Sequence, residues 1–208
     1  MAKILLIDDH PIVRMAARML LEREGHQVVG EAADGVTGLS TARETQPKLV
    51  LLDLDIPALG GLELIARLRT LEPAPRVLVL SAKDPGFYAS RCLRAGAHGY
   101  VYKREDMADL ATGVKAVLAG YRYFPDAFMT TDDPNAPLSN EAKVLDSLSD
   151  RELTVLRYLA LGYTNKQIAD QILINNKTVS SYKARLQEKV GEQSLVGLVE
   201  FAKRNGVV

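Results

Sequence analysis

Five short apolar runs alternate with amphipathic segments over the first 121 residues, and this alternation constrains the fold more than any other feature of the chain. The apolar runs cover residues 3–7, 27–32, 48–53, 76–81 and 98–102. The amphipathic segments lie near residues 11–24, 35–45, 60–70, 84–96 and 105–119. Strands that alternate with helices predict a parallel sheet covered by helices on both faces. We therefore predict an α/β fold, a five-stranded, doubly wound parallel sheet with the flavodoxin-like strand order 2-1-3-4-5.

The segment at residues 11–24 shows the helical period most clearly. Pro11 suits the first turn of a helix, and Gly25 suits the position just after its end. The side chains predicted to share its buried face are those of Ile12, Val13, Ala16, Met19 and Leu20, with Arg14, Arg18 and Glu22 opposite.

Polar side chains stand at the ends of four of the apolar runs. Asp8 and Asp9 follow the first run, Asp53 ends the third, Ser81 ends the fourth, and Lys103 follows the fifth. The carboxyl ends of parallel strands meet at one edge of a sheet, where such folds bind ligands. Carboxylates suit Mg²⁺, and the Asp53 carboxylate can accept a phosphoryl group. Lys103 supplies a fixed positive charge and Ser81 a hydrogen bond to that group, so the pattern predicts a site for a metal ion and a phosphoryl group.

Each of these residues also has a purely structural interpretation. An isolated Asp at the end of a strand is most often a turn or helix-capping residue. Lys103 alone would be a surface charge, and Tyr100 alone would be a core aromatic. His10, next to the acidic pair, is interpreted as a helix-start residue, with a contact at the rim of the site as the alternative. The joint occurrence at four strand ends, in chain order, favours the functional interpretation.

The pattern changes after residue 121. Residues 122–146 are rich in Pro, Asp and Thr and predict an exposed linker, with a short helix near residues 139–146. Residues 147–208 predict an all-α domain of four helices. The first of these begins with Ser149 as N-cap and Glu152 three residues later, the pattern of a capping box.

Charge and cysteine content narrow the class of protein. Residues 147–208 hold 9 Lys and Arg against 6 Asp and Glu, a net charge of +3, whereas residues 1–146 hold 17 and 20, a net charge of −3. A basic second part is compatible with a polyanionic partner. Cys92 is the one cysteine, so no intrachain disulfide can form. The chain has no apolar run of 18 residues and no signal-peptide pattern, so we expect a cytoplasmic protein without a membrane span.

The helices predicted at Asn165–Gln171 and 176–190, joined by a tight turn, form a candidate helix-turn-helix. In the second helix Val179, Leu186 and Val190 are predicted to face inward, and the opposite face is predicted to enter the DNA major groove. The predicted DNA contacts are Lys166, Lys177, Thr178, Ser180, Ser181, Lys183, Ala184 and Arg185. Some apolar residues of the last helix are predicted to pack inward, and the remainder are candidates for a dimer interface. The residues concerned are Leu195, Val196, Leu198, Val199 and Ala202.

Residues 1–121 resemble a response-regulator receiver domain. The matching motifs are Asp8-Asp9, Asp53-Leu54-Asp55-Ile56-Pro57 with Gly60-Gly61, Ser81-Ala82, and Gly99-Tyr100 ahead of Lys103. The resemblance implies that a sensor histidine kinase phosphorylates Asp53. It implies Mg²⁺ bound by Asp8, Asp9, Asp53 and the backbone carbonyl of Asp55. It also implies that Ser81 and Tyr100 move together on phosphorylation.

Residues 147–208 resemble the LuxR/NarL-type DNA-binding domain, through Leu148 to Glu152, Gly162 to Ala169 and Lys177 to Val179. The two parts together resemble NarL/FixJ-type response regulators, most closely the BvgA/EvgA subgroup. This implies a transcription factor that binds promoter DNA as a homodimer and is not an enzyme. Tyr182 departs from the family, which usually has His there. The alternatives are a phosphorylation-independent DNA-binding protein with a vestigial receiver, and a phosphatase of the haloacid-dehalogenase type using Asp53-Leu54-Asp55.

Overall fold

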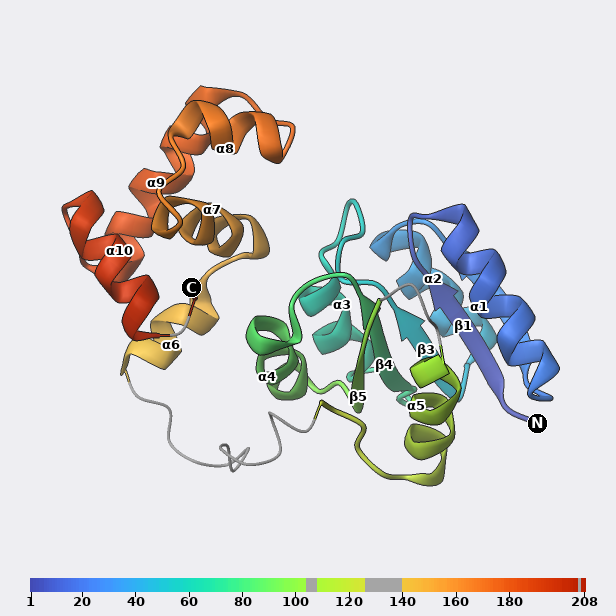
Figure 1. Ribbon diagram of the computed structural model, residues 1–208. Helices are drawn as coiled ribbons and strands as arrows, with labels where there is room; N and C mark the ends of the chain where they lie inside the picture. Colours follow the sequence, from blue (N-terminus) through green and yellow to red (C-terminus); the bar gives the residue numbers. More distant parts are fainter. Residues whose placement is uncertain (104–107, 126–139, 206) are drawn as a thin grey trace. The chain divides into compact units, whose positions relative to one another are not determined.

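A five-stranded parallel sheet organises the first of the two units into which the chain divides, Met1–Pro134 and Asn135–Val208. The computed structural model describes residues 1–103, 108–125, 140–205 and 207–208 (Figure 1). The strands are β1 (Lys3–Ile7), β2 (Gln27–Ala32), β3 (Leu49–Leu52), β4 (Arg76–Ser81) and β5 (Gly99–Tyr102). Their order in the sheet is β2-β1-β3-β4-β5, with every neighbouring pair parallel. The predicted doubly wound fold is confirmed.

Helices cover both faces of this sheet. They are α1 (Pro11–Arg23), α2 (Gly35–Thr45), α3 (Gly61–Leu68), α4 (Pro85–Ala95) and α5 (Ala108–Ala119). The core on the α1 and α5 side consists of Ile4, Leu6, Ala17, Leu21, Leu49, Leu51, Leu78, Leu80, Val101, Leu110, Val114 and Val117. Alternate strand residues point to the other face, where Gly38 of α2 lies against Ile7. Nearly continuous apolar strands are what a sheet buried on both faces requires.

The buried face predicted for α1 is partly wrong. Ala17 and Leu21 are buried, and Val13 and Leu20 pack against the same core. In contrast, Ile12 is 76% exposed and Met19 is 66% exposed. At about 100° per residue, these two side chains project roughly 140–160° away from Ala17. The helix lies on the sheet along the row of residues four apart, so the other edge of the apolar stripe faces solvent.

The chain that follows α5 returns to the edge of the sheet. Tyr123 forms an isolated parallel bridge with Gly99 of β5. The Tyr100 amide donates to the Tyr123 carbonyl oxygen at 2.7 Å, and the Tyr123 amide donates to the His98 carbonyl oxygen at 3.1 Å. Phe124 is buried. Residues 126–139 of the predicted linker lie outside the described residues.

The second unit contains the helices α6 (Asn140–Ser147), α7 (Asp150–Ala160), α8 (Asn165–Gln171), α9 (Asn176–Val190) and α10 (Leu195–Arg204). Short polar side chains cap the starts of four of these helices. Ser149 with Glu152 and Thr164 with Gln167 form capping boxes, Asn175 accepts from the Thr178 amide, and Ser194 accepts from the Gly197 amide. The predicted capping box at Ser149 is therefore confirmed. Among the described residues, no helix is long and apolar enough to cross a membrane.

We predict that Gly99→Ala lowers the free energy of unfolding of the first unit by about 1–3 kcal/mol, through overpacking. A methyl group at this position would lie 2.7 Å from the Tyr123 carbonyl oxygen and 2.7 Å from a methyl of Leu78. Gly60→Ala is the matched control, because nothing lies within 4 Å of the added carbon there. Urea denaturation followed by circular dichroism measures both variants. Equal stabilities for the two would contradict the packing described for residue 123.

Candidate functional sites

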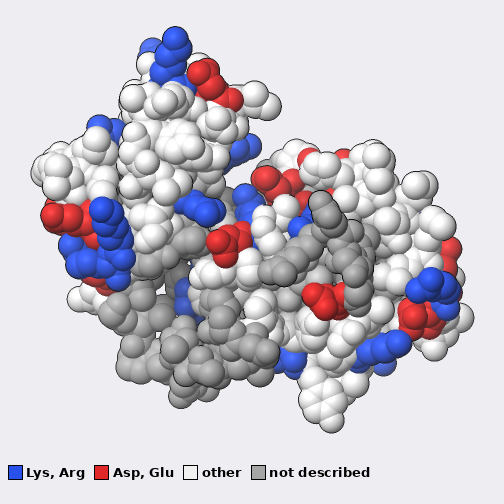
Figure 2. All heavy atoms as spheres, in the orientation of Figure 1, with Lys and Arg blue, Asp and Glu red and all other residues white. Residues whose placement is uncertain are grey.

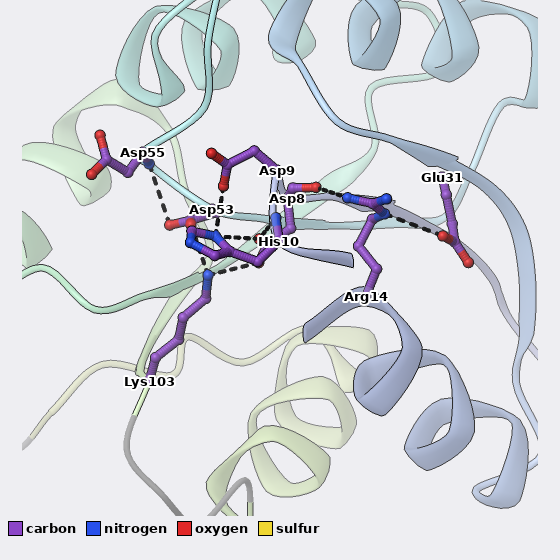
Figure 3. A network of polar contacts seen from close by, with 8 residues as sticks. All are labelled: Asp8, Asp9, His10, Arg14, Glu31, Asp53, Asp55 and Lys103. Atoms are coloured by element: carbon purple, nitrogen blue, oxygen red, sulfur yellow. Dashed lines mark hydrogen bonds and ion pairs between the residues drawn. The ribbon is translucent and has the colours of Figure 1, made fainter. Parts of the chain in front are cut away.

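The carboxyl ends of β1, β3 and β5 bring three charged side chains into contact. Asp8 and Asp53 each follow a strand by one residue, and those strands pair in register at Ile7 and Leu52. The Nζ of Lys103 donates to Oδ2 of Asp8 at 2.7 Å and to Oδ2 of Asp53 at 2.7 Å. Both carboxylates are buried, with residue exposures of 5% and 3%. Figure 3 shows the lysine reaching toward both carboxylates.

The electrostatics of this contact keep Lys103 charged. Burial by itself would lower the pKa of the lysine, but hydrogen bonds and charge interactions with Asp53 and Asp8 outweigh it and raise the pKa. One ammonium faces two buried carboxylates and the nearby carboxylate of Asp9. Ligand atoms of Asp8, Asp9, His10 and Asp53 all lie within 4.8 Å of one another. The excess of negative charge and hard oxygen donors fits a divalent cation.

His10 takes part in this acidic cluster, which is the alternative that the sequence left open beside its interpretation as a helix-start residue. It is the N-cap residue of α1, yet its side chain makes no capping hydrogen bond. Its Nδ1 lies 2.6 Å from Asp9 and 3.3 Å from Asp8. Its backbone amide donates to Oδ1 of Asp8 at 2.9 Å. A histidine immediately after an acidic pair was the only indication in the sequence.

Asp55 contributes to the site through its backbone. Its amide donates to Oδ1 of Asp53 at 3.3 Å. Its carboxylate is 70% exposed and lies 3.7 Å from the Nζ of Lys83. The side chain therefore lies at the rim of the site, while the peptide lies beside the Asp53 carboxylate.

Ser81 and Tyr100 are both fully inside the unit and are joined through Lys83. Ser81 is 0% exposed and its Oγ accepts from the Lys83 amide at 3.4 Å. The Tyr100 hydroxyl donates to the Lys83 carbonyl oxygen at 2.6 Å. Burial raises the pKa of Tyr100 well above its ordinary value, so the hydroxyl stays a hydrogen-bond donor. Lys83 was missed at the sequence level, because nothing in its local pattern distinguishes it from a surface lysine.

Most of the predicted DNA contacts on α8 and α9 are exposed. Val179 and Leu186 are buried as predicted, whereas Val190 is only half-buried. Thr178 and Lys183 are half-buried, and the Thr178 hydroxyl donates to the Asn175 cap. The exposed members are Lys166, Lys177, Ser180, Ser181, Ala184 and Arg185. On the face drawn in Figure 2, basic side chains lie at several places on the helical unit with acidic ones among them.

The predicted dimer candidates on α10 must be reduced from five to three. Leu198 and Ala202 are 0% exposed, because α10 packs against α7 and α9 through them. They cannot contact a partner without unfolding the unit. Val196 is 66% exposed, Leu195 is 42% exposed, and Val199 is half-buried.

The fold and the strand-end site define a receiver unit joined to a helix-turn-helix unit, and comparison with known proteins shows the same combination. Residues 4–115 match the response regulator receiver domain family, and residues 146–202 match the family described as bacterial regulatory proteins, luxR family. The chain therefore belongs to the LuxR-family response regulators.

Several relatives align over nearly the whole chain. A putative transcriptional regulator of Pseudomonas aeruginosa is 49% identical over 100% of both chains. The transcription regulator BvgA of Bordetella pertussis is 48% identical over 99% of this chain and 98% of its own. The transcriptional activator EvgA of Escherichia coli K12 is 36% identical over 98% of each. This pattern agrees with the subgroup resemblance inferred from the sequence.

Solved structures give the same assignment. A LuxR-family response regulator from Aurantimonas is 40% identical, with a TM-score of 0.58, and covers 62% of this chain and 92% of its own. RcsB of Salmonella enterica, solved bound to promoter DNA with a phosphomimetic, is 26% identical, with a TM-score of 0.57 over 96% of this chain and 97% of its own.

We predict that the buried Glu152 makes the stability of the helical unit depend on acid pH. Its carboxylate accepts from Lys189 at 2.8 Å and from the Ser149 amide at 2.7 Å. Burial acts to raise the pKa of Glu152, but these partners outweigh it and lower the pKa. Its contribution is therefore present above the unfolded-state pKa of about 4.3 and is lost as the pH falls through the lower folded value.

Glu152→Gln should lower the free energy of unfolding at pH 7 by about 1–3 kcal/mol and flatten the acid limb of the stability curve. Denaturation from pH 3 to pH 7, followed by circular dichroism, measures both effects. Glu200→Gln, at an exposed position of α10, is the control. An acid limb that is unchanged in Glu152→Gln would refute the assignment.

Proposed function

We propose that a sensor histidine kinase phosphorylates Asp53 and that the phosphorylated protein binds promoter DNA as a dimer to control transcription. One observation carries this proposal: Lys103 joins the buried carboxylates of Asp53 and Asp8 at the strand ends, in a chain that also exposes α9. The solved structures of RcsB bound to DNA, one of which contains two RcsB dimers on two parallel DNAs, support the DNA and dimer parts of the proposal. The proposed role is regulatory and not enzymatic, because the acyl phosphate is itself the signal.

The chemistry assigned to the site is transfer of a phosphoryl group to a carboxylate. An oxygen of Asp53 attacks the phosphorus atom of the donor, the bond from oxygen to phosphorus forms, and the bond from phosphorus to the leaving group breaks. Mg²⁺, held by Asp8, Asp9, Asp53 and the backbone carbonyl of Asp55, would neutralise charge on the phosphoryl oxygens when bound. Lys103 then turns from the Asp53 carboxylate to the new phosphate. The Ser81 hydroxyl donates a hydrogen bond to a phosphoryl oxygen.

The transmission proposed here runs through Lys83 to β5. When Ser81 moves toward the phosphate, it displaces Lys83, whose amide is bonded to the Ser81 hydroxyl oxygen. The carbonyl oxygen of Lys83 accepts the hydrogen bond from the Tyr100 hydroxyl, so Tyr100 is displaced in turn. Tyr100 in turn bonds Tyr123 through its backbone amide. The phosphate biases two existing packings of this segment and does not create a new one. Tyr123 lies at the start of the connection to the helical unit, so in this proposal a movement of Tyr100 reaches the DNA-binding unit through that connection.

In the helical unit, α9 is assigned to the major groove. Ser181 and Ala184 have short side chains that permit close approach to base edges and thymine methyls. Lys183 and Arg185 flank this face and are assigned to phosphates, as is Lys166 of α8. Leu195, Val196 and Val199 remain as the candidate dimer contacts, and two copies are needed to read paired half-sites.

We predict that Asp53→Asn abolishes labelling by a small phosphodonor in the presence of Mg²⁺, because the amide cannot form the acyl phosphate. Intact-protein mass spectrometry measures the added phosphoryl group. Asp55→Asn is the matched control: its carboxylate is exposed at the rim, so labelling should stay within about twofold of wild type. If Asp53→Asn is still labelled, or still gains DNA affinity with the phosphodonor, Asp53 is not the phosphoacceptor and the proposal fails. A wild-type protein that takes no label and binds DNA equally well without the phosphodonor would favour the vestigial-receiver alternative. Turnover of phosphomonoesters would favour the phosphatase.

We predict that Lys183→Ala weakens binding to specific and nonspecific DNA alike and reduces the slope of log affinity against log salt by about 1. Loss of one phosphate contact has this effect because one fewer counterion is released on binding. Fluorescence anisotropy at several salt concentrations measures the slope. Lys203→Ala, at the end of α10, is the control and should leave it unchanged. An unchanged slope in Lys183→Ala would remove this residue from the interface.

A further inference from the structure

Asp8 is held at every polar group it carries. Lys103 binds its Oδ2, and the His10 amide binds its Oδ1. Its own amide donates to the Ala32 carbonyl oxygen at 3.1 Å. Its carbonyl oxygen accepts from Nη1 of Arg14, in the second turn of α1 (Figure 3). The contacts with Lys103 and His10 involve the Asp8 carboxylate and belong to the site already described, whereas Arg14 binds the backbone of Asp8.

Arg14 is itself fixed from the neighbouring strand. Its Nε donates to Oε2 of Glu31, on β2, at 3.2 Å, and its side chain is only 16% exposed. The other oxygen of Glu31 accepts from Nε of Arg18 at 2.6 Å. The Arg14 guanidinium therefore bridges β2 and the loop after β1. Arg18 also binds Glu31, and its other hydrogen bond is donated to Glu22 at 3.0 Å, away from the Asp8 carbonyl oxygen.

We propose that Arg14 is a positioning residue for metal binding. The carbonyl that it holds belongs to the peptide between Asp8 and Asp9. Because a peptide group is planar, fixing its oxygen fixes the plane from which the Asp9 side chain projects. Arg14 thereby sets the direction of the Asp9 carboxylate relative to Asp8 and Asp53. It does this without touching the ion or the phosphoryl group.

The chemistry of arginine suits this task. Its planar fork donates to the Asp8 carbonyl and to Glu31 at the same time, from two different nitrogens. A lysine would keep the positive charge near the three carboxylates but could not bridge both acceptors in one plane. Partners in the second coordination shell of metal sites commonly change affinity by about 10–100-fold when they are removed.

The proposal rests on the metal site of the proposed function, and the test separates the two. Mn²⁺ binding to the full-length, unphosphorylated chain is titrated by electron paramagnetic resonance. Arg14→Ala should raise the Kd for Mn²⁺ about 10-fold. Arg14→Lys should fall between it and wild type. Arg18→Ala should stay within about twofold, because it loses the Glu31 contact but leaves the Asp8 carbonyl held.

A kinetic measurement distinguishes positioning from a general loosening of the fold. Labelling of Arg14→Ala by a small phosphodonor should need about 10-fold more Mg²⁺ for its half-maximal rate and reach a wild-type rate at saturation. A Kd in Arg14→Ala within twofold of wild type overturns the proposal. So does an equal loss in Arg18→Ala, or a rate that Mg²⁺ cannot restore. If the wild-type protein itself binds no Mn²⁺, the metal part of the proposed function fails, and the positioning role proposed for Arg14 fails with it.

Discussion

The contact of one ammonium with two buried carboxylates underlies the rest of the receiver unit. Asp8 and Asp53 are withdrawn from water at the mouth of an apolar sheet, where an unpaired charge would be strongly unfavourable. Lys103, at the end of β5 and fifty residues beyond Asp53 in the chain, compensates the charge of both carboxylates through its hydrogen bonds. Breaking such a pair from one side leaves an uncompensated buried charge. The three strands that carry these residues must therefore end at the same level.

The same contact leaves the site with an excess of negative charge. A single lysine cannot neutralise Asp8, Asp53 and the nearby Asp9, so the site favours the arrival of positive charge. A divalent cation brings this cluster of three carboxylates and one ammonium to neutrality, and a phosphoryl group on Asp53 then adds negative charge at the position that Lys103 already faces. In the proposed mechanism the lysine exchanges one anionic partner for another. In this mechanism no buried charge is left without a partner at either stage, so neither state carries the penalty of an unpaired buried charge.

Features set by chain-local periodicity could be predicted from the sequence, and features set by the facing surface could not. The strand–helix alternation specified the sheet and its order, and polar residues at strand ends specified Asp8, Asp53 and Lys103. The buried face of α1 was partly wrong because Ile12 and Met19 are as apolar as Val13, and only the seating of the helix on the sheet chooses between them. Leu198 and Ala202 were candidate surface residues for the same reason: α7 and α9 decide which side of α10 is covered. Lys83 and Arg14 were not found, because local sequence does not show the contacts of Lys83 with Tyr100 and Asp55 or those of Arg14 with Asp8 and Glu31.

The edge strand β5 is bonded both to the strand-end site and to the segment that leads to the helical unit. On one side its backbone pairs with β4, and on the other side its residues pair with Tyr123. Gly99 permits this second pairing, since a methyl group there would meet the Tyr123 carbonyl oxygen. An edge strand left bare would offer free backbone groups to other chains, so the docked segment also protects the sheet. Tyr100 thus has its hydroxyl fixed by the loop after Ser81 and its amide fixed by the start of the connection to the helical unit. A change in the position of this one residue cannot be absorbed within β5, because both of its polar ends are bonded to segments that belong to the input and output sides of the receiver.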